Sequence, residues 1–183
     1  MLSVSVDLSS LKLQFITDVS PELYADFSCE RAELNQFLQE DAVYYHQQNL
    51  TRTTLVLQDD LVVGFFSLSA DAIQLTPMEK GELALNGEYP IDILPAVKLT
   101  KLAIAQGFEG KGYGKAILDM IVGLVYDLRM AVRFVTVDAI ASKVAFYERH
   151  GFVTSLFRHR QMKQTLKGEQ PDHVLMHKDI YAE

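Results

Sequence analysis

Three stretches of the N-terminal half predict strands. In the first of them apolar and polar residues alternate, as in a half-buried strand. The stretches are residues 11–17 (LKLQFIT), 52–58 (RTTLVLQ) and 61–75 (LVVGFFSLSADAIQL). Asp59 and Asp60 separate the last two, which is typical of a hairpin. Apolar residues recur at helical spacing over 29–46, and we expect Ser28 to cap that helix.

The C-terminal half mixes strands with two helices. Residues 96–104 (AVKLTKLAI) favour a strand, and a glycine-rich loop then leads into a helix over 113–128. A strand over 133–139 follows, and then residues 142–151 (SKVAFYERHG) predict a short helix that Gly151 ends as its C′ residue. We expect a long connection over 76–93 and two last strands over 152–157 and 173–180. Hairpins combined with strand–helix–strand units predict an α/β (α+β) fold, with a mixed sheet and helices on its faces.

The composition fits one domain with a sizeable core, because the chain has 183 residues of which 49% are hydrophobic. The longest uncharged apolar stretch, 120–126, is far shorter than a bilayer requires, and no basic secretory start is present. Cys29 is the single cysteine, which excludes an internal disulfide and favours a reducing compartment. We therefore predict a cytoplasmic protein with no membrane association.

The net charge of −7 disfavours non-specific binding to nucleic acid. Two stretches, 129–133 and 157–167 (FRHRQMKQTLK), are nevertheless locally basic. Such stretches are more often solvated surface than nucleic-acid sites.

The glycine-rich loop at 109–115 (EGKGYGK) has the chemistry of a phosphate site. The first turn of a helix leaves backbone N–H groups unpaired and carries partial positive charge, and glycines allow close approach of a ligand. A plain flexible turn is the alternative interpretation. The loop lacks the Ser or Thr of a nucleoside-triphosphate loop and the spacing of a dinucleotide fold.

Two elements resemble motifs of the GNAT N-acetyltransferase superfamily. Residues 102–104 (LAI) followed by 109–114 (EGKGYG) are similar to its motif A, and 145–152 (AFYERHGF) to its A-x-x-FYE-x-x-GF block. The resemblance covers 97–152 and implies a single N-acetyltransferase domain over 1–183. Its fold would be one mostly antiparallel sheet of six to seven strands, in which two parallel strands splay apart to form a wedge for acetyl-coenzyme A (acetyl-CoA), the acetyl donor.

The resemblance also implies roles for particular residues. Backbone groups of 102–104 would pair with the pantetheine arm, and amides of 110–115 would hold the pyrophosphate. Glu109 departs from the family's Gln or Arg, and Ser142 from its Asn, although Ser142 is still expected to cap the short helix. The donor-binding residues expected are Leu102, Ala103, Ile104, Glu109, Gly110, Lys111, Gly112, Tyr113, Gly114, Lys115 and Ser142.

The implied chemistry is direct attack of a primary amine on the thioester. Tyr147 matches the family tyrosine beside the sulfur and would protonate the departing thiolate; the alternative is an aromatic that packs on the sheet. Asp71 and Asp138 stand near strand ends and are alternative general bases, or surface carboxylates. Cys29 has no base near it in sequence, so we expect burial rather than nucleophilic chemistry, and we predict no metal site.

The acceptor amine is left open between two classes. The main expectation is an amine of a small molecule or a protein. Residues 26–42 (DFSCERAELNQFLQEDA) and 62–73 (VVGFFSLSADAI) also resemble GNAT toxins of toxin–antitoxin pairs, which acetylate aminoacyl-tRNA and are neutralised by a ribbon-helix-helix antitoxin. A non-catalytic acyl-CoA-binding module is the rival from another class. We also predict a homodimer formed through the last strands, since an exposed sheet edge invites pairing.

Overall fold

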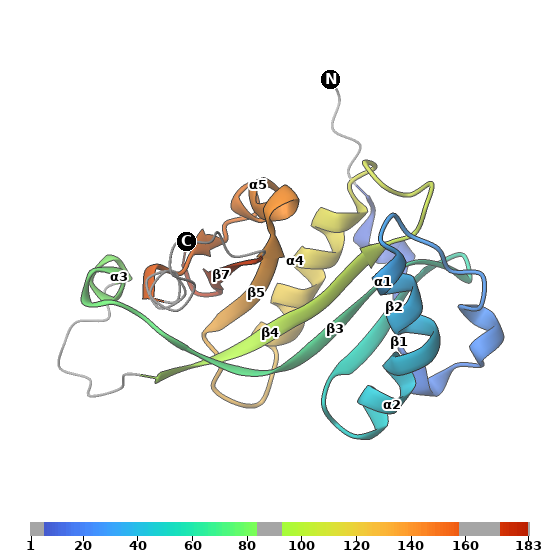
Figure 1. The fold of residues 1–183 in the computed structure, drawn as a ribbon, viewed down its shortest axis with the longest axis horizontal. Coiled ribbons are helices and arrows are strands. Elements are labelled where there is room, and N and C mark those ends of the chain that lie inside the picture. The colour runs from blue at the N-terminus through green and yellow to red at the C-terminus, as the bar shows by residue number, and fades with distance from the viewer. Residues whose placement is uncertain (1–5, 84–92, 158–172, 183) are drawn as a thin grey trace. The chain divides into compact units, whose positions relative to one another are not determined.

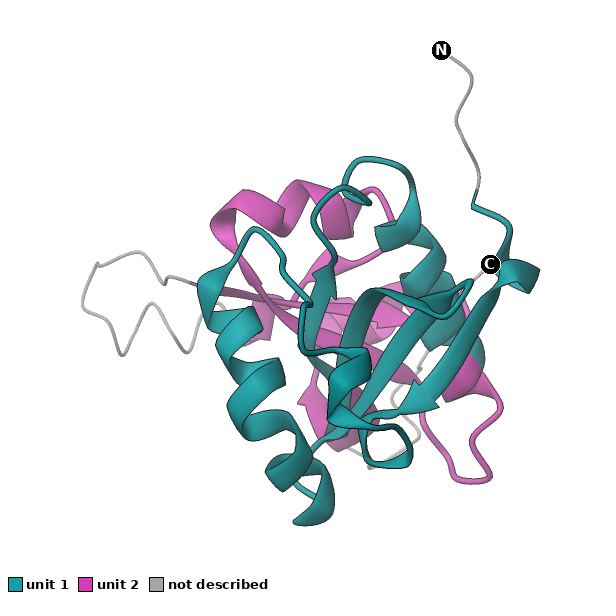
Figure 2. Cartoon of the chain, turned by 90° about the vertical axis from the view of Figure 1, so that its right-hand side faces the viewer, with its two compact units in different colours: residues 1–69, 99–123 teal, residues 70–98, 124–183 magenta. Residues whose placement is uncertain are grey.

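The computed structural model describes residues 6–83, 93–157 and 173–182 (Figure 1). Much of the basic stretch 157–167 therefore lies outside the described residues. The chain divides into two compact units, residues 1–69 with 99–123 and residues 70–98 with 124–183 (Figure 2). The prediction of one domain over 1–183 stays a prediction.

The described residues form a mixed, mostly antiparallel sheet of seven strands, in the order β1-β2-β3-β4-β5-β7-β6, so the predicted fold class is confirmed. Antiparallel pairing joins β1 to β2, β2 to β3, β5 to β7 and β6 to β7. The strands are β1 (Leu11–Phe15), β2 (Arg52–Gln58), β3 (Leu61–Gln74), β4 (Ile93–Ile104), β5 (Phe134–Ile140), β6 (Val153–Thr154) and β7 (His173–Asp179).

The helical segments flank these strands. They are α1 (Ala32–Gln36), α2 (Ala42–Gln47), α3 (Pro77–Glu82), α4 (Tyr113–Tyr126) and α5 (Val144–Glu148). A π-helical turn (Phe37–Asp41) joins α1 to α2, and short 3₁₀ turns cover Leu8–Ser10, Ile16–Asp18, Pro21–Leu23 and Ala141–Lys143.

The helix that the sequence placed at 29–46 exists but begins later, at Ala32. Arg31 is its N-cap and makes no side-chain cap hydrogen bond, so the assignment of Ser28 as the cap is wrong. The reason is local: the Asn35 amide accepts from the Cys29 N–H at 2.8 Å and donates to the Cys29 carbonyl at 3.1 Å. This ring of two hydrogen bonds keeps residue 29 outside the helix.

The hairpin between β2 and β3 is confirmed. Asp59 and Asp60 have φ of 48° and 63°, which is the left-handed pair of a two-residue type I′ turn. A bulge follows where the register shifts between Val56 and Leu57, so that Val56 faces Gly64 and Leu57 faces Val62.

The core of the first unit lies between the α1–α2 segment and the strands it covers. Leu34, Phe37 and Leu38 from the helical segment pack with Leu55 and Phe65 from the sheet in one buried cluster. Phe65 stacks on Phe37 with ring centroids 6.3 Å apart. Burial of these large side chains positions the segment that leads into the helix, residues 23–31.

The second unit corrects two further expectations. The connection over 76–93 contains α3, whose Thr76 and Glu79 form a complete capping box with Pro77 in the first turn. The strand expected over 152–157 is only the two residues of β6. Glu79 also accepts from the Leu156 N–H at 2.8 Å, which ties the start of α3 to the end of this short strand.

Candidate functional site

The glycine loop of the first unit presents backbone amides at the start of α4. Gly107, Gly110 and Gly112 have φ of 88°, 72° and 92°, a region in which a side chain would be strained. The Ala116 N–H donates to the Gly112 carbonyl at 3.1 Å. The N–H groups that precede Ala116 come before the first hydrogen-bonded turn of this 14-residue helix. The geometry fits a diphosphate, because unpaired N–H groups and the helix dipole converge there.

The loop side chains hold positive charge at its surface. Lys111 Nζ lies 5.7 Å from the centre of the Phe108 ring, and Lys115 forms an ion pair with Asp119 one turn along α4. The Phe108 ring in turn contacts Tyr113 edge to face, with centroids 5.2 Å apart. Tyr113 donates its phenol proton to Gln58, so its hydroxyl is directed at β2.

Glu109 stands where the family has Gln or Arg, and its carboxylate is engaged elsewhere. Its Oε1 accepts a long hydrogen bond, 3.4 Å, from the backbone N–H of Glu30. A carboxylate directed at another segment leaves the loop amides themselves available, so the residues present fit the diphosphate of acetyl-CoA.

The end of β4 leads into this loop and is held close to β3. A Cβ built on Gly64 would lie 2.7 Å from the Ala103 carbonyl oxygen and 3.0 Å from Cδ1 of Ile117. Ala103 is buried, whereas Leu102 and Ile104 are half-buried. The glycine on β3 thus sets how closely these two strands approach. No pattern in the sequence indicated this role for Gly64.

Tyr147 lies on α5 in the second unit and is 8% exposed. Its ring contacts Phe146 and Phe152 edge to face, with centroids 5.1 and 5.3 Å away. Phe152 N–H donates to the Tyr147 carbonyl and Gly151 N–H to the Glu148 carbonyl, both at 3.1 Å. With φ of 83° at Gly151, this is a Schellman motif, and it confirms Gly151 as the residue that ends the helix.

Ser142 is exposed in the 3₁₀ turn before α5. The caps of that turn and of α5 are Ile140 and Lys143, and neither makes a side-chain cap hydrogen bond. The expectation that Ser142 caps the short helix is therefore wrong. Its role as a donor contact stays a prediction, as does the role of Tyr147.

Both candidate bases of the second unit already have partners. Asp71 accepts from the Thr136 hydroxyl at 2.5 Å, and Asp138 forms an ion pair with Lys98. Each of these contacts engages only Oδ2, and an ionised carboxylate can accept several hydrogen bonds, so neither contact prevents the carboxylate from accepting a proton.

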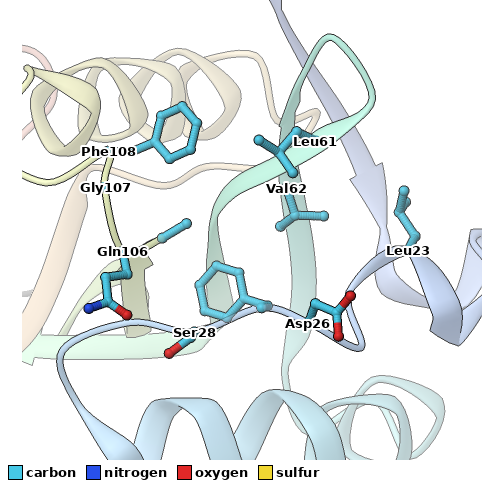
Figure 3. Close-up of a pocket in the computed structure, with 10 residues that line it drawn as sticks. Leu23, Asp26, Ser28, Leu61, Val62, Gln106, Gly107 and Phe108 are labelled. Carbon is cyan, nitrogen blue, oxygen red and sulfur yellow. The ribbon is translucent and has the colours of Figure 1, made fainter.

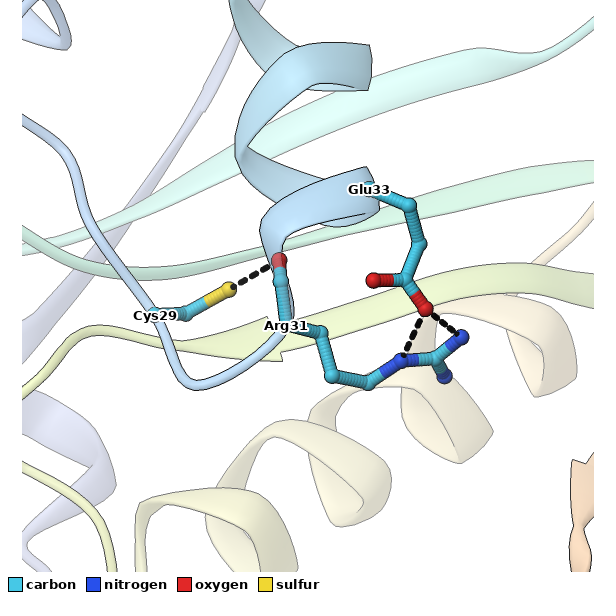
Figure 4. Close-up of polar contacts among 3 residues, drawn as sticks. All are labelled: Cys29, Arg31 and Glu33. Atoms are coloured by element: carbon cyan, nitrogen blue, oxygen red, sulfur yellow. Dashed lines mark hydrogen bonds and ion pairs between the residues drawn. The ribbon is translucent and has the colours of Figure 1, made fainter.

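Cys29 is buried, and burial raises the pKa of its thiol. Its Sγ donates to the Arg31 carbonyl at 3.5 Å, while Arg31 pairs with Glu33 (Figure 4). A thiol held protonated is a poor nucleophile. Within the described ranges, no three His, Cys, Asp or Glu side chains gather as metal ligands, and no helix there is long and apolar enough to cross a bilayer.

Comparison with known proteins places this geometry in a family. A tRNA-acetylating toxin of Mycobacterium tuberculosis (strain ATCC 25618 / H37Rv) is 26% identical over 132 residues, which is 70% of this chain and 77% of the relative. The toxin AtaT in complex with acetyl-methionyl-tRNAfMet superposes with a TM-score of 0.70 at 22% identity, covering 90% of this chain and 93% of the other.

A mutant of AtaT bound to acetyl-CoA and the C-terminus of the antitoxin AtaR gives a TM-score of 0.65 at 21% identity, covering 90% of this chain and 91% of the other. The family model described as an acetyltransferase (GNAT) domain matches residues 51–154, more than half of the chain and the whole span from β2 to β6. The protein belongs to the GNAT acetyltransferases.

Proposed function

We propose that this acetyltransferase moves the acetyl group of acetyl-CoA onto the free amino group of an aminoacyl-tRNA. The observation that carries the choice of acceptor is the similarity to a tRNA-acetylating toxin over 70% of the chain. Acetyl transfer to an amine is the activity of the GNAT acetyltransferases. The acceptor first expected, an amine of a small molecule or a protein, has no comparable support.

Acetyl-CoA supplies an activated acyl group as a thioester. The chain would hold it with two sets of backbone groups of the first unit. The edge of β4 at Leu102–Ile104 would pair with the pantetheine amides, and N–H groups over 110–115 would bind the diphosphate. Lys111 would add positive charge at the loop surface.

The reaction forms a bond between the amine nitrogen and the acetyl carbon and breaks the carbon–sulfur bond. The sulfur leaves with the bonding electron pair and takes up one proton, while the nitrogen loses one. Tyr147 would supply the proton to sulfur, because a phenol with a reference pKa of about 10 is protonated at neutral pH. Its packing against Phe146 and Phe152 fixes the ring.

The amino group of an aminoacyl-tRNA needs little help from a general base of the enzyme. An α-amino group has a reference pKa of about 7.7–8.0, so a sizeable fraction is neutral before it binds. A lysine side chain, with a reference pKa of about 10.4, would need stronger assistance.

The same proposal sets the place and the partners of the enzyme. Charged tRNA and acetyl-CoA are cytoplasmic, so the protein would act there. As a toxin it would be neutralised by an antitoxin, as AtaT is bound by AtaR. The net charge of −7 implies that tRNA is recognised by local basic groups rather than by an overall positive field.

The test is acetylation of purified charged tRNA. We expect N-acetyl-aminoacyl-tRNA by mass spectrometry after incubation with acetyl-CoA, and a turnover about a hundredfold lower for Tyr147→Phe with an unchanged melting temperature. Uncharged tRNA and a panel of small amines and proteins are the controls. Thioester consumption with small amines or proteins but not with charged tRNA would overturn the choice of acceptor. Acetyl-CoA binding without consumption by any acceptor would instead favour a non-catalytic module.

A further inference from the structure

A pocket of about 500 Å³ lies in the first unit, beside Phe108 and ahead of the glycine loop (Figure 3). Three segments line it: residues 23–28 before α1, residues 61–62 at the start of β3, and residues 105–108 after β4. We call it the Leu61 pocket. Its volume is in the range that takes a bulky side chain or a small ligand.

The walls of the Leu61 pocket are mainly apolar, and hydrogen bonds hold them in place. Leu23, Leu61 and Phe108 contribute side chains, and Leu61 is 55% exposed although it is a large aliphatic residue. Backbone hydrogen bonds join the three segments: Gln106 N–H donates to the Ser28 carbonyl at 2.7 Å, and Ala105 N–H to the Val63 carbonyl at 2.9 Å. A preformed pocket loses little entropy when it binds.

The charge around the pocket is mostly negative, although the Lys111 ammonium lies 5.7 Å from the centre of the Phe108 ring. Residues 22–30, 58–62 and 105–110 contain no Lys or Arg, but they contain six carboxylates: Glu22, Asp26, Glu30, Asp59, Asp60 and Glu109. Asp26 itself lines the pocket (Figure 3). Such a rim attracts a cation beside an apolar anchor, while Lys111 lies toward the loop proposed to bind the diphosphate.

We propose that the Leu61 pocket docks a basic segment of a partner protein. One bulky apolar side chain of that segment enters between Leu61 and Phe108, and neighbouring Lys or Arg side chains pair with Asp26 and the Asp59–Asp60 turn. The inference goes beyond acetyl transfer and does not depend on it. It rests on the match between an apolar pocket and an acidic rim.

The test is binding of the full chain to an array of short peptides. Each peptide places Leu, Phe or Trp between lysines or arginines, and a matched set places the same residues between glutamates. We expect the basic set to bind, with affinity that falls as salt rises, and the acidic set not to bind. Asp26→Asn combined with Asp59→Asn and Asp60→Asn should weaken binding about tenfold, and Leu61→Asn at least as much. Asparagine tolerates the positive φ of the turn, so the fold should survive.

The control variant is Asp127→Asn, an exposed carboxylate far along the chain, which should leave the affinity within about twofold. Stabilisation by acetyl-CoA in a thermal-shift assay, retained in all variants, shows that they fold and separates this proposal from the acetyltransferase one. Three results would overturn it: no basic peptide binds, acetyl-CoA displaces the peptides completely, or the chain self-associates in a way that Leu61→Asn abolishes.

Discussion

Replacement of Gly64 by alanine tests how the sheet positions the end of β4. The new Cβ would lie 2.7 Å from the Ala103 carbonyl oxygen, a backbone atom, and 3.0 Å from the terminal methyl of Ile117. An ordinary carbon–oxygen contact is about 3.3 Å or more, so β3 and β4 would have to separate by roughly 0.6 Å. Ile117 is fully buried and has little room to yield.

The energetic result follows from two opposing terms. Overpacking of this kind lowers the free energy of unfolding by about 1–3 kcal/mol. A Gly→Ala change raises it by about 0.4–1 kcal/mol, because alanine reduces the conformational entropy of the unfolded chain. We therefore expect a net loss of about 1–2 kcal/mol in the free energy of unfolding. For a chain of this size, that corresponds to a fall of roughly 2–8 °C in melting temperature.

The assay is thermal or urea unfolding of Gly64→Ala beside Gly123→Ala. Gly123 lies within α4, where a Cβ would have no heavy atom within 4 Å, so alanine there should stabilise by about 0.5–1 kcal/mol. Acetyl-CoA should also raise the melting temperature of Gly64→Ala by less than that of the unchanged chain, since Ala103 belongs to the stretch proposed to pair with pantetheine. If Gly64→Ala proved as stable as Gly123→Ala, the close approach of β3 and β4 would be refuted.

Two further predictions concern the second unit. The carboxylate of Glu79 accepts from the N–H groups of Thr76 and Leu156 at 2.7 and 2.8 Å. An amide can accept at only one of its two ends, so Glu79→Gln should lower the free energy of unfolding in urea by about 1–3 kcal/mol. The exposed Glu82→Gln in the same helix is the control, and equal stability of the two variants would contradict the assignment. Burial lowers the pKa of His177 below its usual 6.5, and in the described part of the chain its Nδ1 has no hydrogen-bond partner. The unfolded chain then binds more protons, so the free energy of unfolding should fall as pH drops below about 6.5. His177→Phe should fall less steeply between pH 7 and pH 5; some slope should persist, because burial also lowers the pKa of His46. An identical slope in His177→Phe would show that protonation of His177 does not limit stability.

The sequence predicted those parts of the fold whose signals are local. The paired aspartates of the β2–β3 turn and Gly151 after α5 adopt the positive φ that their positions require. The capping box at Thr76 and Glu79 has an equally local signature: a threonine, then proline and, at the third position, glutamate. The two prolines and two glycines of 76–93 favoured a connection instead.

Other features have no signature in the sequence pattern, and some of them depend on residues distant in the chain. The true start of α1 is set by Asn35 bonding back to Cys29, and the π-helical turn at Phe37–Asp41 has no compositional mark. The direction of the Glu109 carboxylate depends on an N–H that lies 79 positions earlier, at Glu30. The Leu61 pocket likewise forms only where three separate segments meet.

Isothermal titration of acetyl-CoA into the chain and two glycine variants is the most direct test of the loop. Gly107 and Gly110 have φ of 88° and 72°, and a methyl group added at either would have no heavy atom within 4 Å. Gly107→Ala and Gly110→Ala therefore carry the same backbone strain, about 1–2 kcal/mol. Only Gly110 lies among the amides proposed to bind the diphosphate. We predict measurable heat when acetyl-CoA binds the unchanged chain, and a several-fold weaker affinity for Gly110→Ala than for Gly107→Ala. Absence of heat with the unchanged chain, or equal affinities in the two variants, would contradict the assignment of this loop as the diphosphate site.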